Sequence, residues 1–172
     1  FTSILIFDDV FTNLQFFNNV MRETLNFPSG KVRNYTFYST EQNNKTNILV
    51  RCEEQLNVYM LTERDDFDCH NSDELSIKVR ANPVERVDGK HVNLTGKAAR
   101  NYFRSMLTRA GLEVIGIKLS NVRFCIKIEG LRDVKLIAQS FTADVRVLDR
   151  YKFLKAYAAG IGRRKNIGFG MI

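Results

Sequence analysis

Strand-like and helix-like segments follow one another in a fixed order along the first half of this chain. Apolar runs and period-two alternation predict strands, whereas apolar residues three and four apart predict a helix. The segments read strand, helix, strand, strand and strand, at residues 3–7, 12–25, 35–39, 47–52 and 75–79. A polar turn joins the third and fourth segments into a hairpin. The acidic stretch from Glu53 to Asp73 is expected to be an irregular connection with room for one short helix.

The second half repeats this order in pattern, although not residue by residue. An amphipathic helix is predicted from Gly96 to Ala110, because its apolar residues share one face, and Gly111 ends it. Strands follow at 112–119, 122–129 and 134–147, then a helix capped by Asp149 that reaches residue 159, then a strand at 167–172. The pattern predicts an α+β fold of two tandem ferredoxin-like (RRM-like) βαββαβ domains, residues 1–82 and 83–172, with a C-terminal glycine-rich loop.

Charge is distributed unevenly between the two halves. Residues 1–77 carry a net charge of −6 and residues 78–172 a net charge of +13, which together give the +7 of the whole chain. This asymmetry predicts a polyanion-binding surface in the second half, and nucleic acid is the obvious class of polyanion. A basic solvated face without any partner is the simpler alternative.

A glycine-rich segment near the C-terminus combines backbone freedom with positive charge. Four glycines, the first two at 160 and 162, bracket the consecutive cations Arg163, Arg164 and Lys165. Glycine permits positive φ and close backbone approach, and successive N–H groups in such a turn can hold an anion. A helix end with a tight turn would explain the glycines but not the cations. We therefore predict RNA contacts at Gly160, Gly162 and the three cations.

A second basic group lies on the helix predicted at 96–110. Lys97, Arg100 and Arg104 are spaced about one helical turn apart, so they form a row on the face opposite the apolar stripe. Such a row suits the phosphate backbone of an RNA duplex. An ordinary solvated helix face is the alternative interpretation.

Several other chemistries are disfavoured. The three cysteines have no C-x-x-C spacing, which argues against a disulfide scaffold and a structural zinc site. The glycine segment lacks the Gly-Lys-Ser/Thr ending of a phosphate-binding P-loop. Asp8-Asp9 and Asp65-Asp66 are paired acids of the kind usually found in solvated turns. We therefore expect neither a metal nor another cofactor.

The chain shows no signal peptide and no long apolar run. We therefore expect a soluble, cytoplasmic protein without a membrane partner. Because the sequence starts at Phe1 and not at a methionine, we also expect a few residues to precede it.

Four motifs occur in an order that resembles one protein family. Residues 80–84 (R-A-N-P-V) close a strand, and residues 89–94 (G-K-H-V-N-L) precede a helix. Residues 141–149 (F-x-A-x-V-x-V-x-D) lead into the last helix, and the Gly-Ile-Gly…Gly-Phe-Gly loop follows. This arrangement resembles the CRISPR RNA-processing endoribonucleases of type I-E systems, the CasE branch of the RAMP superfamily. The resemblance covers the chain nearly end to end.

The resemblance implies a protein that binds the repeat hairpin of CRISPR transcripts. Family members cut at the 3′ base of the hairpin without a metal. The ribose 2′-OH attacks the adjacent phosphate and leaves a cyclic phosphate, with acid–base help from a histidine and a nearby tyrosine. They commonly stay on the 3′ handle as a subunit of an effector complex. The implied partners are therefore the CRISPR RNA repeat hairpin and other effector-complex subunits.

The sequence departs from this family pattern at the catalytic position. The family histidine lies in the first helix, whereas residues 14–22 contain none, and Asn18 or Asn19 falls in its place. An amide donates a hydrogen bond but cannot shuttle a proton near neutral pH. Losing a general acid–base typically removes a factor of about 10²–10⁴ in rate. The catalytic group is therefore unknown, with Asn18, Asn19 and Arg22 as candidates.

Other groups offer partial substitutes. His70 is most simply a surface residue in the acidic connection, and His91, beside basic residues, is a better RNA contact than a base. Nearby cations could stabilise a transition-state phosphate, and two phenols are available, although both suit packing in the hairpin. These groups are Lys31, Arg33, Tyr35 and Tyr38.

Three functions remain open from the sequence. The first is a CRISPR RNA endoribonuclease with a modified active site, which the family resemblance favours. The second is a catalytically inactive CRISPR RNA-binding subunit, or a mimic of the processing nuclease, which the missing histidine favours. The third is an RRM-like protein unrelated to CRISPR, but the strand aromatics are too ordinary to indicate the stacking platform that it would need.

Overall fold

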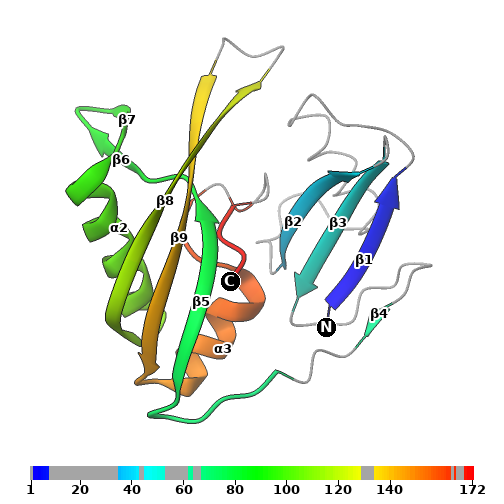
Figure 1. Ribbon diagram of the computed structural model, residues 1–172, viewed down its shortest axis with the longest axis vertical. Helices are drawn as coiled ribbons and strands as arrows, with labels where there is room; N and C mark the ends of the chain where they lie inside the picture. Colours follow the sequence, from blue (N-terminus) through cyan, green and yellow to red (C-terminus); the bar gives the residue numbers. More distant parts are fainter. Residues whose placement is uncertain are drawn as a thin grey trace.

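The computed structural model describes residues 2–7, 35–42, 45–52, 62–63, 67–128, 134–163, 165 and 169–172. Within these ranges the chain forms three sheets and two helices (Figure 1). None of the described helices is long and apolar enough to cross a membrane. The strands are β1 (Thr2–Phe7), β2 (Tyr35–Gln42), β3 (Lys45–Cys52), β4 (Thr62–Glu63), β5 (Glu74–Ala81), β6 (Val84–Val87), β7 (Lys90–Asn93), β8 (Leu112–Ile128) and β9 (Val134–Val147), and the helices are α2 (Gly96–Arg109) and α3 (Arg150–Ala159).

The first sheet has the strand order β2-β3-β1-β4, and every neighbouring pair is antiparallel. This is the strand order of a ferredoxin-like unit. The apolar residues Tyr35 and Phe37 on β2 and Ile48 and Val50 on β3 are buried, and so are Thr36 and Arg51. The strand predicted at 3–7 and the hairpin predicted at 35–52 are therefore confirmed. The helix predicted at 12–25 lies outside the described residues.

One predicted strand belongs to a different sheet from the one expected. The segment at 75–79 was expected to complete the first half, but β5 pairs with β9 in a second sheet of order β5-β9-β8. The fourth strand of the first sheet is β4, which pairs with Thr2 and Ser3 of β1. A strand of two residues has no alternation to detect, so the sequence pattern could not reveal it. The boundary between residues 82 and 83 stays a prediction, although the pairing groups β5 with the second sheet.

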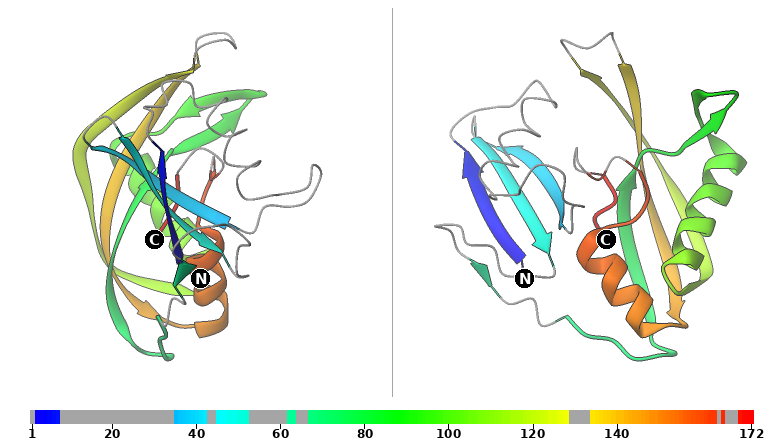
Figure 2. Two further views of the ribbon diagram at one scale, coloured as in Figure 1. Left: turned by 90° about the vertical axis from the view of Figure 1, so that its right-hand side faces the viewer. Right: turned by 180° about the vertical axis from the view of Figure 1, so that it is seen from behind.

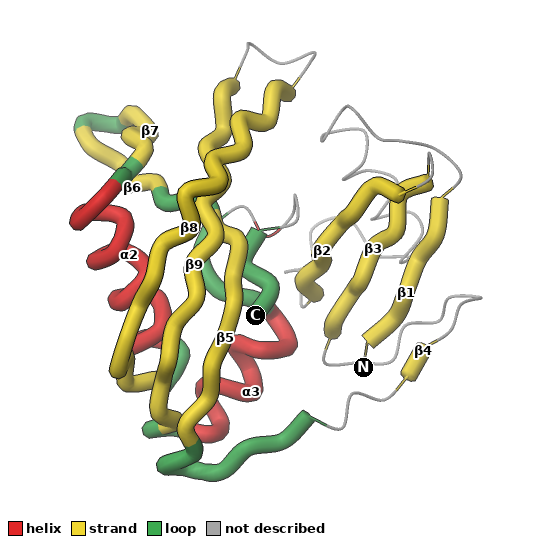
Figure 3. The backbone as a smooth tube through the Cα atoms, in the orientation of Figure 1, coloured by secondary structure: helices red, strands yellow, loops and turns green. Residues whose placement is uncertain are grey.

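The β8–β9 pair also differs from the expectation. The sequence predicts separate strands at 112–119 and 122–129, whereas β8 runs continuously from Leu112 to Ile128. Its register against β9 shifts between Leu119 and Arg123. The irregularity accommodates the polar Ser120-Asn121 pair without a chain reversal. Figure 3 shows the outer part of this pair extending well beyond β5.

Helices α2 and α3 cover the same face of the second sheet (Figures 1 and 2). Phe103 of α2 is fully buried, and its ring stacks on Phe141 of β9 with the centroids 4.0 Å apart. Each large side chain buried in this way contributes about 1.5–3 kcal/mol. The predicted cap of α3 is confirmed, since the Asp149 carboxylate accepts the backbone N–H of Lys152 at 3.0 Å.

The C-terminal residues lie between the two sheets (Figure 1). Arg51 of β3 is buried and donates from Nη1 to the carbonyl oxygens of Ile172 at 2.8 Å and Tyr157 at 3.4 Å. The N–H of Gly170 donates to the Arg80 carbonyl of β5 at 2.8 Å. The strand predicted at 167–172 is not formed by its described residues, 169–172. The reason is local, because Gly170 has φ +85°, which no extended strand can adopt.

Candidate nucleic-acid interface

The glycine loop begins where α3 ends. Gly160 and Gly162 have φ +73° and +78°, a region that other residues rarely adopt. The N–H of Ile161 donates to the Gly170 carbonyl at 2.8 Å, which clasps the two ends of the loop. A Cβ at Gly160 would lie 2.7 Å from Oγ1 of Thr36, so this glycine allows β2 to approach. Buried Gly160 therefore has a packing role, and its predicted contact with RNA stays a prediction.

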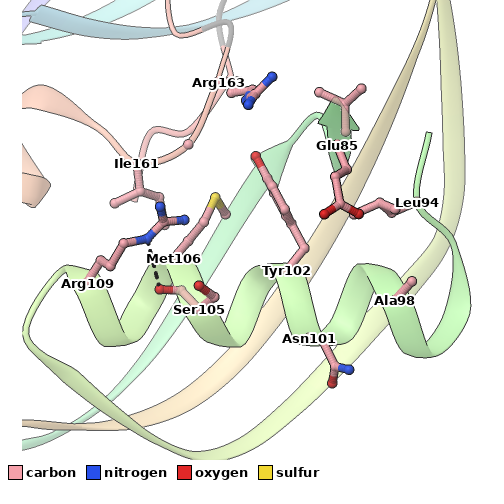
Figure 4. A pocket seen from close by; sticks show the side chains of 12 residues that line it. Glu85, Leu94, Ala98, Asn101, Tyr102, Ser105, Met106, Arg109, Ile161 and Arg163 are labelled. Atoms are coloured by element: carbon pink, nitrogen blue, oxygen red, sulfur yellow. Dashed lines mark hydrogen bonds between the residues drawn. The ribbon is translucent and has the colours of Figure 1, made fainter. Parts of the chain in front are cut away.

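Beyond Gly160, the loop and α2 form the two walls of a groove, which we call the loop groove (Figure 4). Its volume is about 710 Å³. The lining combines apolar side chains with hydroxyl, amide and charged groups, as expected of a site that takes a large polar ligand. The lining residues are Val84, Glu85, Leu94, Ala98, Asn101, Tyr102, Ser105, Met106, Arg109, Ile161, Gly162 and Arg163.

Tyr102 lies where α2 meets the loop. In Figure 4 its hydroxyl is directed towards Arg163. A Cβ at Gly162 would lie 2.7 Å from Sδ of Met106 and 3.6 Å from the Tyr102 hydroxyl, so the loop passes closely over both side chains. Burial raises the pKa of Tyr102, although Arg163 acts in the opposite direction through its charge and a backbone hydrogen bond. The phenol is therefore protonated at neutral pH, so its O–H is available to donate a hydrogen bond.

Two cations and one carboxylate line the loop groove. Arg163 comes from the loop, and Arg109 comes from the last turn of α2. The Arg109 side chain is steadied along its helix, because Nε donates to the Ser105 carbonyl at 3.3 Å. Glu85 of β6 faces the same groove (Figure 4). The charged lining is positive on balance, which suits an anionic ligand.

The other two cations of the loop are placed differently. Lys165 turns back onto its own loop, with Nζ 3.3 Å from the Gly160 carbonyl. Burial lowers the pKa of this ammonium group. Arg164 lies outside the described residues. Of the three consecutive cations, Arg163 is therefore the one that the described structure places in the groove.

The second predicted basic group lies on another flank of α2. Lys97, Arg100 and Arg104 are exposed, and Nη1 of Arg104 donates to the Val114 carbonyl of β8 at 3.4 Å. Tyr102, by contrast, faces the glycine loop. At 3.6 residues per turn, the middle of the basic row lies roughly 120° around the helix from the groove-lining side chains. The structure therefore does not bring the two predicted RNA-binding groups onto one surface.

The catalytic candidates of the first helix, Asn18, Asn19 and Arg22, lie outside the described residues, as do Lys31 and Arg33.

The two histidines lie apart from the loop groove lining. His70 is exposed, with Nδ1 3.9 Å from an Asp73 carboxylate oxygen. His91 is exposed on β7 and pairs across the hairpin with Arg86. The exposed position of His91 suits the RNA contact expected there, which stays a prediction. Of the two phenols, Tyr35 is buried, whereas Tyr38 is 38% exposed.

The sequence patterns missed three lining residues. By its spacing, Tyr102 falls in the apolar stripe of the predicted helix, although a tyrosine at the edge of such a stripe commonly presents its hydroxyl to a neighbouring surface. Arg109 ends the same helix and was not grouped with the basic row. Glu85 carried no signal, because its place at the groove depends on the β6–β7 hairpin. Within the described part of the chain, no three His, Cys, Asp or Glu side chains gather as metal ligands.

Comparison with known proteins bears on both fold and family. Thermus thermophilus Cse3, bound to an RNA representing a pre-cleavage complex, matches 99% of this chain and 97% of its own, with TM-score 0.77 and 13% identity. Cas6e from Escherichia coli K-12 matches 99% of this chain and 96% of its own, with TM-score 0.75 and 16% identity. A chain of a CRISPR RNA-guided surveillance complex has the same coverages, TM-score 0.72 and 20% identity. At such identities these matches establish a shared fold.

A search of curated protein sequences found no match. The family model described as "CRISPR associated protein", however, matches residues 26–172. That match spans most of the chain, including the two described helices, α2 and α3, and the four motifs that carry the resemblance. The family assignment made from those motifs is confirmed, and the chain belongs to the CRISPR associated protein family.

Proposed function

We propose that this protein binds the repeat hairpin of CRISPR transcripts, takes part in their processing, and stays on the 3′ handle as a subunit of an effector complex. The observation that carries the proposal is the loop groove, in which Arg163 and Arg109 line an open space of about 710 Å³. Thermus thermophilus Cse3, which shares the fold, was solved bound to RNA. The fold is also shared by a chain of a surveillance complex, which supports the assembly role.

The proposed cleavage uses the RNA itself as nucleophile. The ribose 2′-OH attacks the adjacent phosphorus and releases its proton to solvent water. The bond to the 5′ oxygen breaks, that oxygen takes up a proton to leave as a 5′-OH, and a 2′,3′-cyclic phosphate remains. Negative charge develops on the phosphate oxygens, where Arg163 and Arg109 stabilise it electrostatically. Protonated Tyr102 donates a hydrogen bond to the same oxygens or to the leaving group. No metal is needed for this reaction, because the cations of the chain supply the compensating charge.

The proton acceptor is the missing component. Asn18, Asn19 and Arg22 occupy the first-helix segment where the family carries a histidine, and neither an amide nor a guanidinium accepts a proton near neutral pH. Electrostatic assistance alone leaves cleavage slower by a factor of about 10²–10⁴ than with a general base. The proposed nuclease is therefore a slow one.

A catalytically inactive RNA-binding subunit, or a mimic of the processing nuclease, is the second candidate. It is favoured by one specific observation, namely that neither histidine of the chain, His70 or His91, lines the loop groove. RNA binding by the loop groove is common to both candidates. They differ in whether the bound RNA is cut.

The deciding experiment incubates the protein with its cognate repeat RNA in EDTA and resolves binding and cleavage on gels. A single cut that persists in EDTA, and disappears when the nucleotide before the cut carries a 2′-deoxyribose, supports the slow nuclease. Tight binding of intact RNA supports the inactive subunit. Absence of binding to the hairpin would overturn both.

A further inference from the structure

A second basic groove lies between the two sheets. It is lined by Tyr38, Leu49, Arg51, Lys78, Arg80, Ser140, Met171 and Ile172, has a volume of about 260 Å³, and is called here the inter-sheet groove. Lys78 and Arg80 alternate with buried Ile77 and Val79 along β5, so they point to the face of the second sheet opposite α2 and α3. The inter-sheet groove is therefore distinct from the loop groove.

Two cations of this groove, Lys78 and Arg80, form no ion pair with the carboxylates of the described residues. No acidic residue is among the described residues that line the groove. The other end of the same face is different, since Arg146 binds both Glu74 at 2.8 Å and Glu113 at 2.9 Å. Arg146, at one end of this face, is thus paired with carboxylates, whereas Lys78 and Arg80 at the groove have no described carboxylate as an ion-pair partner.

An aromatic ring and a hydroxyl accompany the cations. The guanidinium of Arg80 lies 4.5 Å from the centroid of the Tyr38 ring, while Tyr38 remains 38% exposed. Ser140 pairs with Arg80 across the β5–β9 ladder and faces the same groove. Lys78 and Arg80 are two residues apart on one strand, so their side chains leave the sheet roughly 7 Å from one another. Cations that follow a backbone beside a ring that stacks a base are the usual components of a single-strand binding site.

The same C-terminal segment borders both grooves. Ile161, Gly162 and Arg163 line the loop groove, whereas Met171 and Ile172 line the inter-sheet groove. The Ile161–Gly170 hydrogen bond holds these two stretches against each other. The described ends of one segment therefore border both grooves, and an RNA chain that occupied both would have to pass this segment.

We propose that the inter-sheet groove binds a single-stranded RNA segment that flanks the hairpin, with phosphates on Lys78 and Arg80 and one base against Tyr38. The inference rests on the proposed function, because it assumes that the hairpin occupies the loop groove. The volume of the inter-sheet groove, about 260 Å³, suits one nucleotide. Pockets for small ligands start at about 300 Å³, slightly above this volume. An acidic peptide of a protein partner would match the charges but leaves the exposed ring without a specific role.

The test compares two RNAs by fluorescence anisotropy over a range of salt concentrations. One is the bare repeat hairpin, and the other is the same hairpin with single-stranded extensions at both ends. The variants are the double substitution Lys78→Gln/Arg80→Gln and the single substitution Lys78→Gln. The Lys78 side chain is exposed, so the single substitution should leave folding intact. The matched control is Lys118→Gln, which removes an exposed cation from the same sheet, two strands away from β5 and outside the groove.

The extensions should tighten binding by the wild-type protein. They should also steepen the slope of log K against log salt by about 1.4, or roughly 0.7 for each of two phosphate contacts. The double variant should lose this gain, Lys78→Gln should lose about half of it, and Lys118→Gln should keep it. Binding of the bare hairpin should be unchanged in all three.

Three outcomes would overturn the inference. The extensions add nothing for the wild type, or Lys118→Gln behaves like Lys78→Gln, or the groove variants bind both RNAs normally but fail to assemble with other subunits. The last result would assign the groove to a protein partner. Failure of the proposed function looks different, because the wild type would then not bind the bare hairpin at all.

Discussion

The two flanks of α2 carry similar charges but hold them in different ways. On the loop flank, Arg109 is steadied by the Ser105 carbonyl, Lys165 by the Gly160 carbonyl, and Arg163 follows a clasped glycine turn. On the β8 flank, Lys97 and Arg100 are exposed with no described partner, and Arg104 makes one long hydrogen bond to Val114. The loop flank therefore has two cations held by backbone carbonyls, Arg109 and Lys165, whereas the β8 flank has one, Arg104.

This difference predicts which flank of α2 contributes more to RNA affinity. A long cationic side chain that is free in solution loses conformational entropy when it orders on a phosphate, whereas one already held by the protein loses less. The loop groove is also concave and partly apolar, so charges in it are less screened by water than charges on an exposed helix face. We therefore expect the loop flank to dominate RNA affinity and the β8 flank to add a weaker, more salt-sensitive contribution.

The largest effect is predicted for the loop cations. The variant Arg163→Gln/Arg164→Gln/Lys165→Gln should weaken hairpin binding at least roughly a hundredfold and reduce the salt slope by about 2 to 3. The matched variant Lys97→Gln/Arg100→Gln/Arg104→Gln removes the same charge from the other flank and should lose less affinity. Salt titrations of binding measure both. A larger loss for the second variant would reverse the comparison.

The next effect concerns the clasp that holds the loop flank. A Cβ at Gly170 would collide with the backbone carbonyl of Ile161, and φ is +85°. We expect Gly170→Ala to lower the free energy of unfolding by at least about 3 kcal/mol, because backbone atoms must move in addition to the left-handed strain. Gly89→Ala is the control, since φ is +77° but nothing lies within 4 Å of the added Cβ. Its cost should be about 1 kcal/mol. Equal costs in chemical denaturation would contradict the clasp.

The comparison of flanks also shows where sequence reasoning succeeds and where it stops. The helix at 96–110 and its exposed basic row were predicted correctly, because a periodic pattern within one element determines which residues share a face. The position of that row relative to Arg163 was not predicted, because it depends on how the glycine loop crosses α2. The fold prediction was limited in the same way, because strand pairing between distant segments cannot be read from a local pattern. The strand β4 and the sheet to which β5 belongs are the two examples. Asn18, Asn19 and Arg22 stay predictions.

A smaller effect is expected at the carboxylate of the loop flank. Glu85 lines the same groove as Arg163, and its negative charge repels an incoming phosphate. Glu85→Gln removes that repulsion and should tighten hairpin binding roughly two- to fivefold, the scale of exposed charge interactions. Asp144→Asn, an exposed carboxylate on the opposite face of the second sheet, is the control for net charge. Equal gains in both variants would mean that overall charge, and not the groove, sets the effect.

The smallest predicted effect is a difference between Lys165 and exposed Lys97 in how they contribute to the pH dependence of the free energy of unfolding. Burial lowers the pKa of Lys165 below its ordinary 10.5. Between the lowered folded pKa and 10.5, the unfolded chain binds more protons than the folded chain, so this group makes stability rise with pH. Lys165→Met should remove that rise, whereas Lys97→Met on the exposed row should keep it. Unfolding free energies measured from neutral pH to about 10 test this, and Tyr102, whose pKa burial raises, is common to all three proteins. Parallel pH profiles for Lys165→Met and Lys97→Met would show that Lys165 is as freely solvated as the exposed basic row of α2. The contact between Lys165 and the Gly160 carbonyl would then no longer distinguish the loop flank from the β8 flank.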